Sequence, residues 1–235
     1  MSKTTIPRGG ITADAINGTL IADDAIDSEH YTDGSIDTAH IGDNQVTAAK
    51  ATGVGNLVKI GTVATDNSNV SALTIDNCFS STYDMYRIVG YHSATSAGAH
   101  NYFRWRTGGS SGSSYTSSDY QWINDGAHIK SEPLYEEYRN WNYSSNHARV
   151  GSAMDVDADS SYVTFDLLVT DPNTNVMSRA QVTGTSCLRM TADDKWTTHH
   201  VAITNAANVN ATGFEMTVST GSINYGRVTV YGLAQ

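Results

Sequence analysis

Cysteine is nearly absent from this chain. Only Cys78 and Cys187 occur among 235 residues. Both stand beside apolar residues, and neither is accompanied by the histidine and carboxylate pattern of a thiol nucleophile. We therefore expect two buried free thiols, and we exclude a disulfide scaffold as the source of stability.

Long apolar runs are also missing. No stretch is long enough to span a membrane, and the start of the chain, Met1–Thr5, lacks the apolar segment of a signal peptide. The sequence therefore predicts no membrane insertion and synthesis in the cytoplasm without export by the usual secretory route. A content of 39% hydrophobic and 16% charged residues still suits a chain that buries a core.

Positive charge is scarce as well. Lysine and arginine number 14 against 24 acidic residues, which gives a net charge of −10, and the first fifty residues hold eight acidic and three basic side chains. Because a surface that follows phosphates needs clustered lysine and arginine, we expect no binding to nucleic acid.

What the chain does have is a repeat of five residues at its start. One large apolar residue returns at every fifth position, and Asx and glycine steps such as Asp33-Gly34 stand between these residues. A period of five matches neither an α-helix nor a flat strand, because in either one the apolar residues would not share a single face that can be buried. The repeat therefore predicts a backbone turn within every pentad. The apolar column, after Ile6, consists of Ile11, Ile16, Ile21, Ile26, Tyr31, Ile36, Ile41 and Val46.

A ribbon with one apolar residue in five cannot bury that residue alone, because ordering the backbone costs about 1–2 kcal/mol per residue. A single-chain solenoid would have very few coils. We therefore predict that identical chains wind about a shared axis, most simply as a homotrimer. The predicted organisation is a repeat shaft at residues 1–50, a linker at 51–56 and a separate domain at 57–235, which we call the knob.

Two histidines, His30 and His40, lie one decad apart in the shaft, each directly before an apolar position. On a three-fold axis such imidazoles could meet and hold a metal ion or an anion. The alternative is a solvated turn residue that is satisfied locally.

From residue 57 onward the pattern changes to that of β-strands. Apolar and hydrophilic residues alternate in Phe214–Val218, and polar turn clusters separate the apolar or β-branched runs. We predict an all-β knob, an antiparallel β-sandwich of the jelly-roll kind. The expected strands lie in Leu57–Val63, Tyr83–Tyr91, Tyr102–Trp105, Tyr162–Val169, His199–Ile203 and Gly226–Leu233.

Several runs carry a family resemblance. Ser81–Val89, Tyr102–Arg106 with the Gly/Ser loop after it, and the closing Gly226–Gly232 resemble the β-sandwich domain of bacteriophage tail-fibre and virion appendage proteins, and the decads resemble the shaft repeats that precede such domains. The resemblance implies a structural protein on the phage particle surface, in a tail fibre or head fibre. It would bind other virion proteins through its N-terminus and a host-surface glycan through the knob. The alternative is a head-decorating or tail-adaptor protein that recognises no receptor.

An aromatic segment, Tyr135–Tyr143, is the best candidate for ligand contact. Flat aromatic faces beside Asn, Arg and Glu suit sugar rings. The alternative is that these rings belong to the sandwich core or to a subunit interface. The candidate glycan-binding residues are Tyr138, Arg139, Trp141 and Tyr143, with Trp122 and Tyr120 as possible extensions.

Other chemistry has weak support. Asp155, Asp157 and Asp159 imitate the start of a calcium loop, but Ser160 stands where the loop needs glycine, and a plain acidic turn explains them equally. Glu136 and Glu137 are adjacent, so on a strand they face opposite sides and cannot form a glycosidase pair. We predict no enzymatic activity and no cofactor.

Overall fold

The computed structural model describes residues 10–12, 19–22, 25–37, 39–42, 45–46, 57–129, 135–154, 162–173, 180–190 and 195–233. The chain divides into two units, residues 1–54 and residues 55–235, and the division falls inside the predicted linker.

In the N-terminal unit a backbone turn recurs every five residues. The amide N–H groups of Ala25, His30, Ser35, His40 and Gln45 each donate to the carbonyl oxygen three residues earlier, at N···O distances of 2.9–3.1 Å. One of these turns continues into a short 3-10 helix, η1 (Ser28–His30). The predicted turn within each pentad is confirmed for these five repeats.

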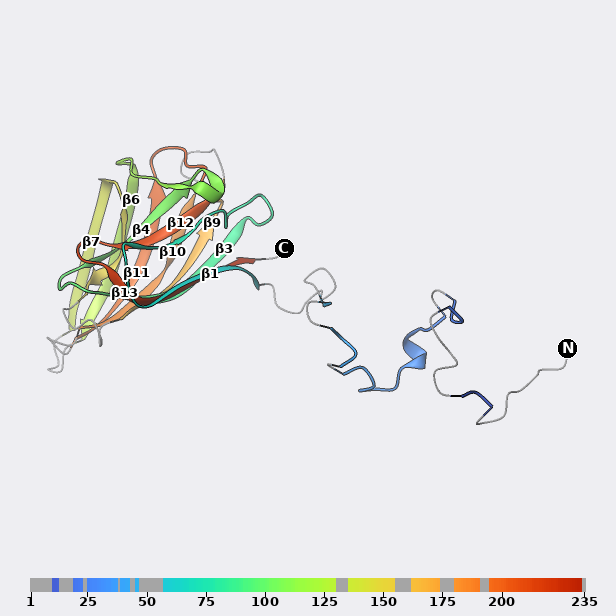
Figure 1. The fold of residues 1–235 in the computed structure, drawn as a ribbon. Helices are drawn as coiled ribbons and strands as arrows, with labels where there is room; N and C mark the ends of the chain where they lie inside the picture. Colours follow the sequence, from blue (N-terminus) through green and yellow to red (C-terminus); the bar gives the residue numbers. More distant parts are fainter. Residues whose placement is uncertain are drawn as a thin grey trace. The chain divides into compact units, whose positions relative to one another are not determined.

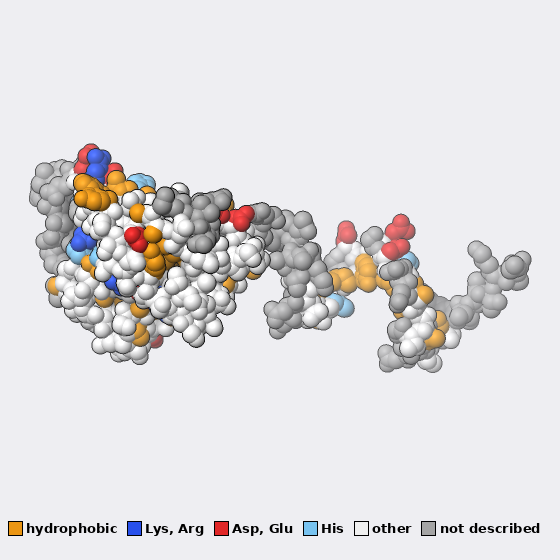
Figure 2. Space-filling view, turned by 90° about the horizontal axis from the view of Figure 1, so that it is seen from above, with side chains coloured by type: hydrophobic (Ala, Val, Ile, Leu, Met, Phe, Trp, Pro, Cys, Tyr) orange, Lys and Arg blue, Asp and Glu red, His pale blue; other side chains and the backbone are white. Residues whose placement is uncertain are grey.

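The apolar column of the N-terminal unit is exposed in the single chain. Its described members, which include Ile21 and Val46, are 36–57% exposed. Figure 2 shows hydrophobic side chains along this unit, with acidic and histidine side chains between them. Ile16 lies outside the described residues. An exposed column that returns in phase with the turns is the surface a packed shaft would need.

The C-terminal unit consists of two antiparallel sheets packed as a β-sandwich (Figure 1). The eight-stranded sheet has the order β1-β13-β3-β9-β10-β11-β6-β7, and the five-stranded sheet runs β2-β12-β4-β5 with β8 also paired to β4. A second short 3-10 helix is η2 (Gly109–Ser111). The strands are β1 (Leu57–Val70), β2 (Ala72–Ile75), β3 (Met85–Ala94), β4 (His100–Thr107), β5 (Ser113–Ser114), β6 (Tyr120–Ile129), β7 (Tyr135–Ser145), β8 (Ala148–Ala153), β9 (Val163–Thr170), β10 (Gln181–Met190), β11 (Lys195–Asn205), β12 (Gly213–Val218) and β13 (Ile223–Leu233).

Alternation along each strand decides which side chains enter the core. In β9, Phe165, Leu167 and Val169 are buried while the residues between them are more exposed. In β4, Phe103 and Trp105 point inward in the same way. Because side chains alternate across a strand, these residues cover the inner faces of the two sheets, and every predicted strand run overlaps an observed strand.

An aromatic cluster fills the centre of the sandwich. The ring centroids of Phe103 and Trp105 lie 4.8 Å apart at an interplanar angle of 87°, and those of Phe79 and Tyr86 lie 4.8 Å apart at 69°. Phe79 also stacks on Phe214 at 5.9 Å. Edge-to-face pairs of this kind contribute about 0.5–1.5 kcal/mol beyond the area that they bury.

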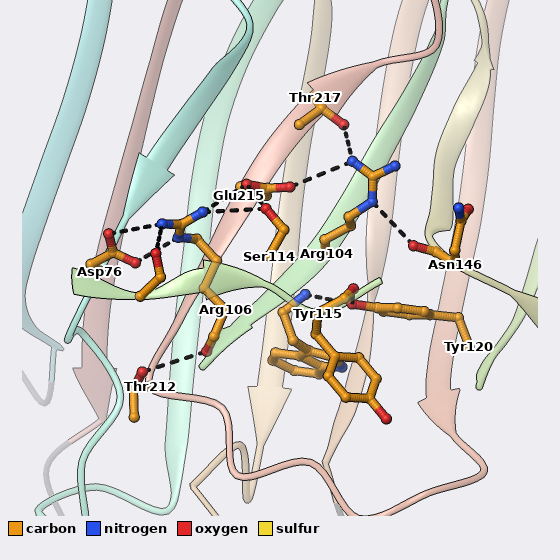
Figure 3. A network of polar contacts seen from close by, with 12 residues as sticks. Asp76, Arg104, Arg106, Ser114, Tyr115, Tyr120, Asn146, Thr212, Glu215 and Thr217 are labelled. Carbon is orange, nitrogen blue, oxygen red and sulfur yellow. Dashed lines mark hydrogen bonds and ion pairs between the residues drawn. The ribbon is translucent and has the colours of Figure 1, made fainter. Parts of the chain in front are cut away.

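The outer face of the five-stranded sheet carries a network of ion pairs (Figure 3). Arg106 pairs with Asp76 at 2.6 Å and with Glu215 at 3.1 Å, and Arg104 lies 3.5 Å from Glu215. The hydroxyl of Ser114 donates to Glu215 at 2.8 Å. Only 5–24% of these charged side chains is exposed, so their charges are satisfied by one another.

Candidate functional site

Trp141 and Tyr143 form an exposed aromatic pair on β7, which is an edge strand of the eight-stranded sheet. Their side chains are 60% and 71% exposed. The ring centroids lie 6.0 Å apart at an interplanar angle of 26°, so the rings are stacked. Residues i and i+2 of a strand share a face, and the two rings therefore form one platform on the outer side of the sheet.

A groove of about 440 Å³ lies beside this platform. Strand pairing places Ile123 of β6 directly opposite Trp141, and Ile123 lines the groove together with Tyr143. Trp122 and Ile203 also line it, although their side chains are buried in the core. The remaining lining residues are uncharged and come from four strands: Gln121, Asn142, Gln181, Thr183, Ala202 and Thr204.

A charged pair lies two positions farther along the β6–β7 pair. Arg139 faces Asp125 in the strand register, and their side chains lie 3.5 Å apart. Both are well exposed, at 66% and 46%, so this ion pair contributes about 0–1 kcal/mol. The groove itself presents amide and hydroxyl groups beside apolar surface, and none of the described residues that line it is charged.

Tyr120 does not belong to the platform, which corrects the sequence prediction. Its side chain is fully buried. The hydroxyl accepts a hydrogen bond from the Trp105 amide at 2.8 Å and donates to the carbonyl of Tyr115 at 3.0 Å. Burial raises the pKa of this phenol strongly. Tyr120 is a core residue because its inward position in β6 and its two hydrogen bonds leave no face for a ligand.

The other predicted glycan residues divide between inside and outside. Trp122 is only 6% exposed, and the guanidinium of Arg149 lies 5.7 Å from the centre of its ring. Arg139 is exposed on the same strand as Trp141. Tyr138 belongs to β7, but its side chain lies outside the described part of the structure. Of the predicted glycan residues, Trp141 and Tyr143 thus lie together on the surface. Tyr143 and Trp122 are among the residues that line the groove.

His30 and His40 are bonded within their own turns. His30 Nδ1 lies 2.7 Å from Asp27 Oδ1, and His40 Nδ1 lies 2.8 Å from Asp37 Oδ1. The hydrogen bonds from His40 and from the Ala39 amide lower the pKa of Asp37. These hydrogen bonds within each turn fit the second alternative for His30 and His40, a turn residue that is satisfied locally.

The predicted calcium-binding residues Asp155, Asp157 and Asp159 lie outside the described residues. Among the residues that are described, no three histidine, cysteine, aspartate or glutamate side chains gather closely enough to hold a metal ion.

Both cysteines are free thiols: Cys78 is buried and Cys187 is half-buried. Burial raises the pKa of Cys78 to about 12, which keeps this thiol protonated and unreactive.

Sequence reasoning missed the β10 and β11 side of the groove. Thr183 and Ala202 face each other across these two strands, and Ile123 pairs with Ala202 from β6. Thr183 and Ala202 are 19 residues apart along the chain, and Ile123 is 60 or more residues from both, so only strand pairing brings the three together. The one local signal is the alternation Gln181-Val-Thr183-Gly-Thr185, which is typical of a strand with a hydroxyl-rich outer face.

Within the described part of the chain no helix is long and apolar enough to cross a membrane. Comparison of the sequence with protein-family models and with curated proteins, and of the fold with solved structures, gave no match.

Proposed function

We propose that this chain is a structural protein of a bacteriophage particle whose knob adheres to a glycan of the host surface through the Trp141–Tyr143 platform and the adjoining groove. The observation that carries the proposal is a stacked pair of aromatic side chains, 60% and 71% exposed, beside a groove with a neutral lining. Exposed apolar groups that lie together on a folded domain often mark a binding site.

The chemistry of the site fits a sugar ring. The apolar face of a pyranose can lie on Trp141 or Tyr143, while the side chains of Gln121, Asn142 and Thr183 offer both donors and acceptors to its hydroxyl groups. Since the described lining of the groove holds no charged side chain, the groove favours an uncharged sugar. No catalytic role is part of this proposal.

The N-terminal unit serves in the proposal as a shaft. Identical chains, most simply three, would cover the exposed apolar column that includes Ile26 and Ile36 by winding about a common axis. The N-terminus would bind other proteins of the virion. The jelly-roll description of the knob and the location in a tail fibre or head fibre belong to this same proposal.

Three knobs on one shaft also make weak sites sufficient. A single neutral groove binds with low affinity, but linked copies raise the apparent affinity by about 10²–10⁴-fold when the geometry allows simultaneous contact. Adhesion of a particle therefore does not require a deep pocket on each knob.

Replacement of Trp141 by alanine tests the site. We expect W141A to weaken glycan binding by about 10- to 100-fold, equivalent to about 1.4–2.8 kcal/mol, because half of the platform is lost. Binding is measured with the purified full-length protein on an array of bacterial-surface glycans and on host cells.

Trp196→Ala is the matched control, because Trp196 is 50% exposed on β11 and does not line the groove. W196A should bind as the unchanged protein does. Equal binding by W141A and the unchanged protein would remove the platform from the site. It would favour the head-decorating or tail-adaptor role, in which the knob contacts only virion proteins.

A further inference from the structure

Three further depressions lie on the outer face of the eight-stranded sheet, apart from the Trp141–Tyr143 groove. Their volumes are about 420, 490 and 330 Å³. The first and second share Thr164 and Asp166, and the second and third share Thr198 and His200. Because neighbouring depressions share lining residues, they adjoin one another in a row, which we call the trough.

The strand register shows the direction of this trough. Asp166 of β9 faces Thr185 of β10, which faces His200 of β11, and His200 faces Asp125 of β6. These residues form one wall. The trough therefore runs across the strands, from β13 and β3 at one end to β7 at the other. Six strand spacings correspond to about 29 Å.

Hydroxyl groups and paired charges line the trough. The hydroxyls of Thr164, Thr185 and Thr198 stand along its middle part. Asp166 accepts a hydrogen bond from Arg87 at 2.8 Å, and Asp125 lies 3.5 Å from Arg139. These carboxylates keep lone pairs that can accept further hydrogen bonds from vicinal hydroxyls, while their charge is balanced.

One end of the trough carries an aromatic side chain. Tyr91 is 41% exposed, lines the first depression and packs edge-to-face against Tyr162 at 5.7 Å. A polyanion is disfavoured because the protein carries a net charge of −10 and the described lining of the trough has no excess of positive charge: Asp125 and Asp166 are paired with arginines, and Arg227 is matched by Glu137.

The position of the trough also argues against a polypeptide occupant. An extended peptide usually adds to the edge of a sheet, where backbone groups are unpaired. This trough crosses the middle of the sheet, where the backbone groups already pair in ladders. Its walls hold few large apolar side chains of the kind that fill the core of a protein interface.

We infer that the trough binds an extended, unbranched run of uncharged sugar residues, as a second contact region beside the Trp141–Tyr143 groove. This inference rests on the proposed glycan adhesion and names its ligand class, a linear neutral polysaccharide. Ile123 of the groove and Asp125 of the trough are two residues apart on β6, so one chain can reach both sites.

Thr198→Trp is the test, because Thr198 is exposed and lines two of the three depressions. The full-length protein is applied to an array of neutral and acidic bacterial polysaccharides. Oligosaccharides of increasing length are then prepared from the polymer that binds best. We expect affinity to rise with length, and T198W to lower the affinity for long chains by about tenfold or more, about 1.4 kcal/mol, while short oligosaccharides bind as before.

Thr82→Trp is the control, since Thr82 is exposed in the turn before β3 and lines none of the depressions described above. Long chains that bind T198W as tightly as T82W would overturn the inference, and so would preference for acidic polymers. A change in the mass of T198W in solution would show that another copy covers this face, which also overturns it. If W141A lost binding while T198W bound as the unchanged protein does, the proposed adhesion would stand and the trough would be refuted as a binding region.

Discussion

His92 makes the knob sensitive to acid. Its side chain lies on the inner face of β3, fully buried, and neither ring nitrogen has a hydrogen-bond partner among the described residues. The ring packs edge-to-face against Phe165 at 6.1 Å. Gly226 leaves it this space, because a Cβ there would lie 2.8 Å from the Cβ of His92. Burial lowers the pKa of His92 from 6.5 to about 4.

This difference fixes the direction and the size of the effect. In the unfolded chain His92 takes up a proton as the pH falls through 6.5, whereas in the folded knob it stays neutral until the pH approaches 4. As the pH falls from 6.5 to about 4, the unfolded state therefore becomes more stable relative to the folded knob. The free energy of unfolding contributed by His92 should fall by about 2 kcal/mol between pH 7.5 and pH 5, and by about 3 kcal/mol in total below pH 4.

His92→Leu removes the titrating group and puts an apolar side chain of similar size against Phe165. Unfolding by urea is followed by tryptophan fluorescence, since Trp105 and Trp122 are buried. The free energy of unfolding of the unchanged protein should drop by about 2 kcal/mol more than that of H92L between pH 7.5 and pH 5. Above pH 7 the two proteins should show parallel pH dependence. An equal drop in both proteins at pH 5 would refute the reasoning.

Three other substitutions address the shaft, the ion network and the sheet. Ile26→Asp should dissociate or fray the shaft while the knob stays folded, as checked by mass in solution and circular dichroism; normal assembly would contradict the shared apolar core. Glu215→Ala should lower the free energy of unfolding by about 3 kcal/mol, because it removes a nearly buried partner of Arg104 and Arg106. A loss below about 1 kcal/mol in urea unfolding would show that Asp76 alone is enough to balance the charge of these arginines. Gly184→Ala should lower the free energy of unfolding by about 1–3 kcal/mol, because its Cβ would overlap the Asp166 carbonyl of the neighbouring strand. Unchanged stability in the same assay would mean that β9 and β10 can move apart to make room for the Cβ without cost.

The sequence predicted those parts of the fold that depend on local periodicity. The pentad turns follow from a period that no helix or strand can use, and strands such as β9 and β12 follow from alternation or from a dense β-branched run. The strand β10 was missed because its glycine, threonine and serine residues give little apolar signal. The order of strands in each sheet was not predicted, because it depends on pairing between residues far apart in the chain.

The candidate site shows the same limit in one pair of residues. Tyr120 and Trp141 both stand in polar, aromatic-rich sequence, yet one is fully buried and the other is 60% exposed. Their fates depend on which face of the sheet each residue occupies and on the irregular register between Tyr120 and Trp122. No local pattern contains that information.

The two outer faces of the sandwich differ in a way that bears on function. On the five-stranded sheet, Arg104, Arg106 and Glu215 neutralise one another and are largely buried, so that face offers few free donors or acceptors. On the eight-stranded sheet the outward residues include many threonines and several exposed rings, and all the depressions described above lie there. A face that leaves hydroxyl and aromatic groups uncovered gains stability only when a ligand covers them. The eight-stranded sheet is therefore the face where binding should be sought, and substitutions on the five-stranded sheet should alter stability before they alter adhesion.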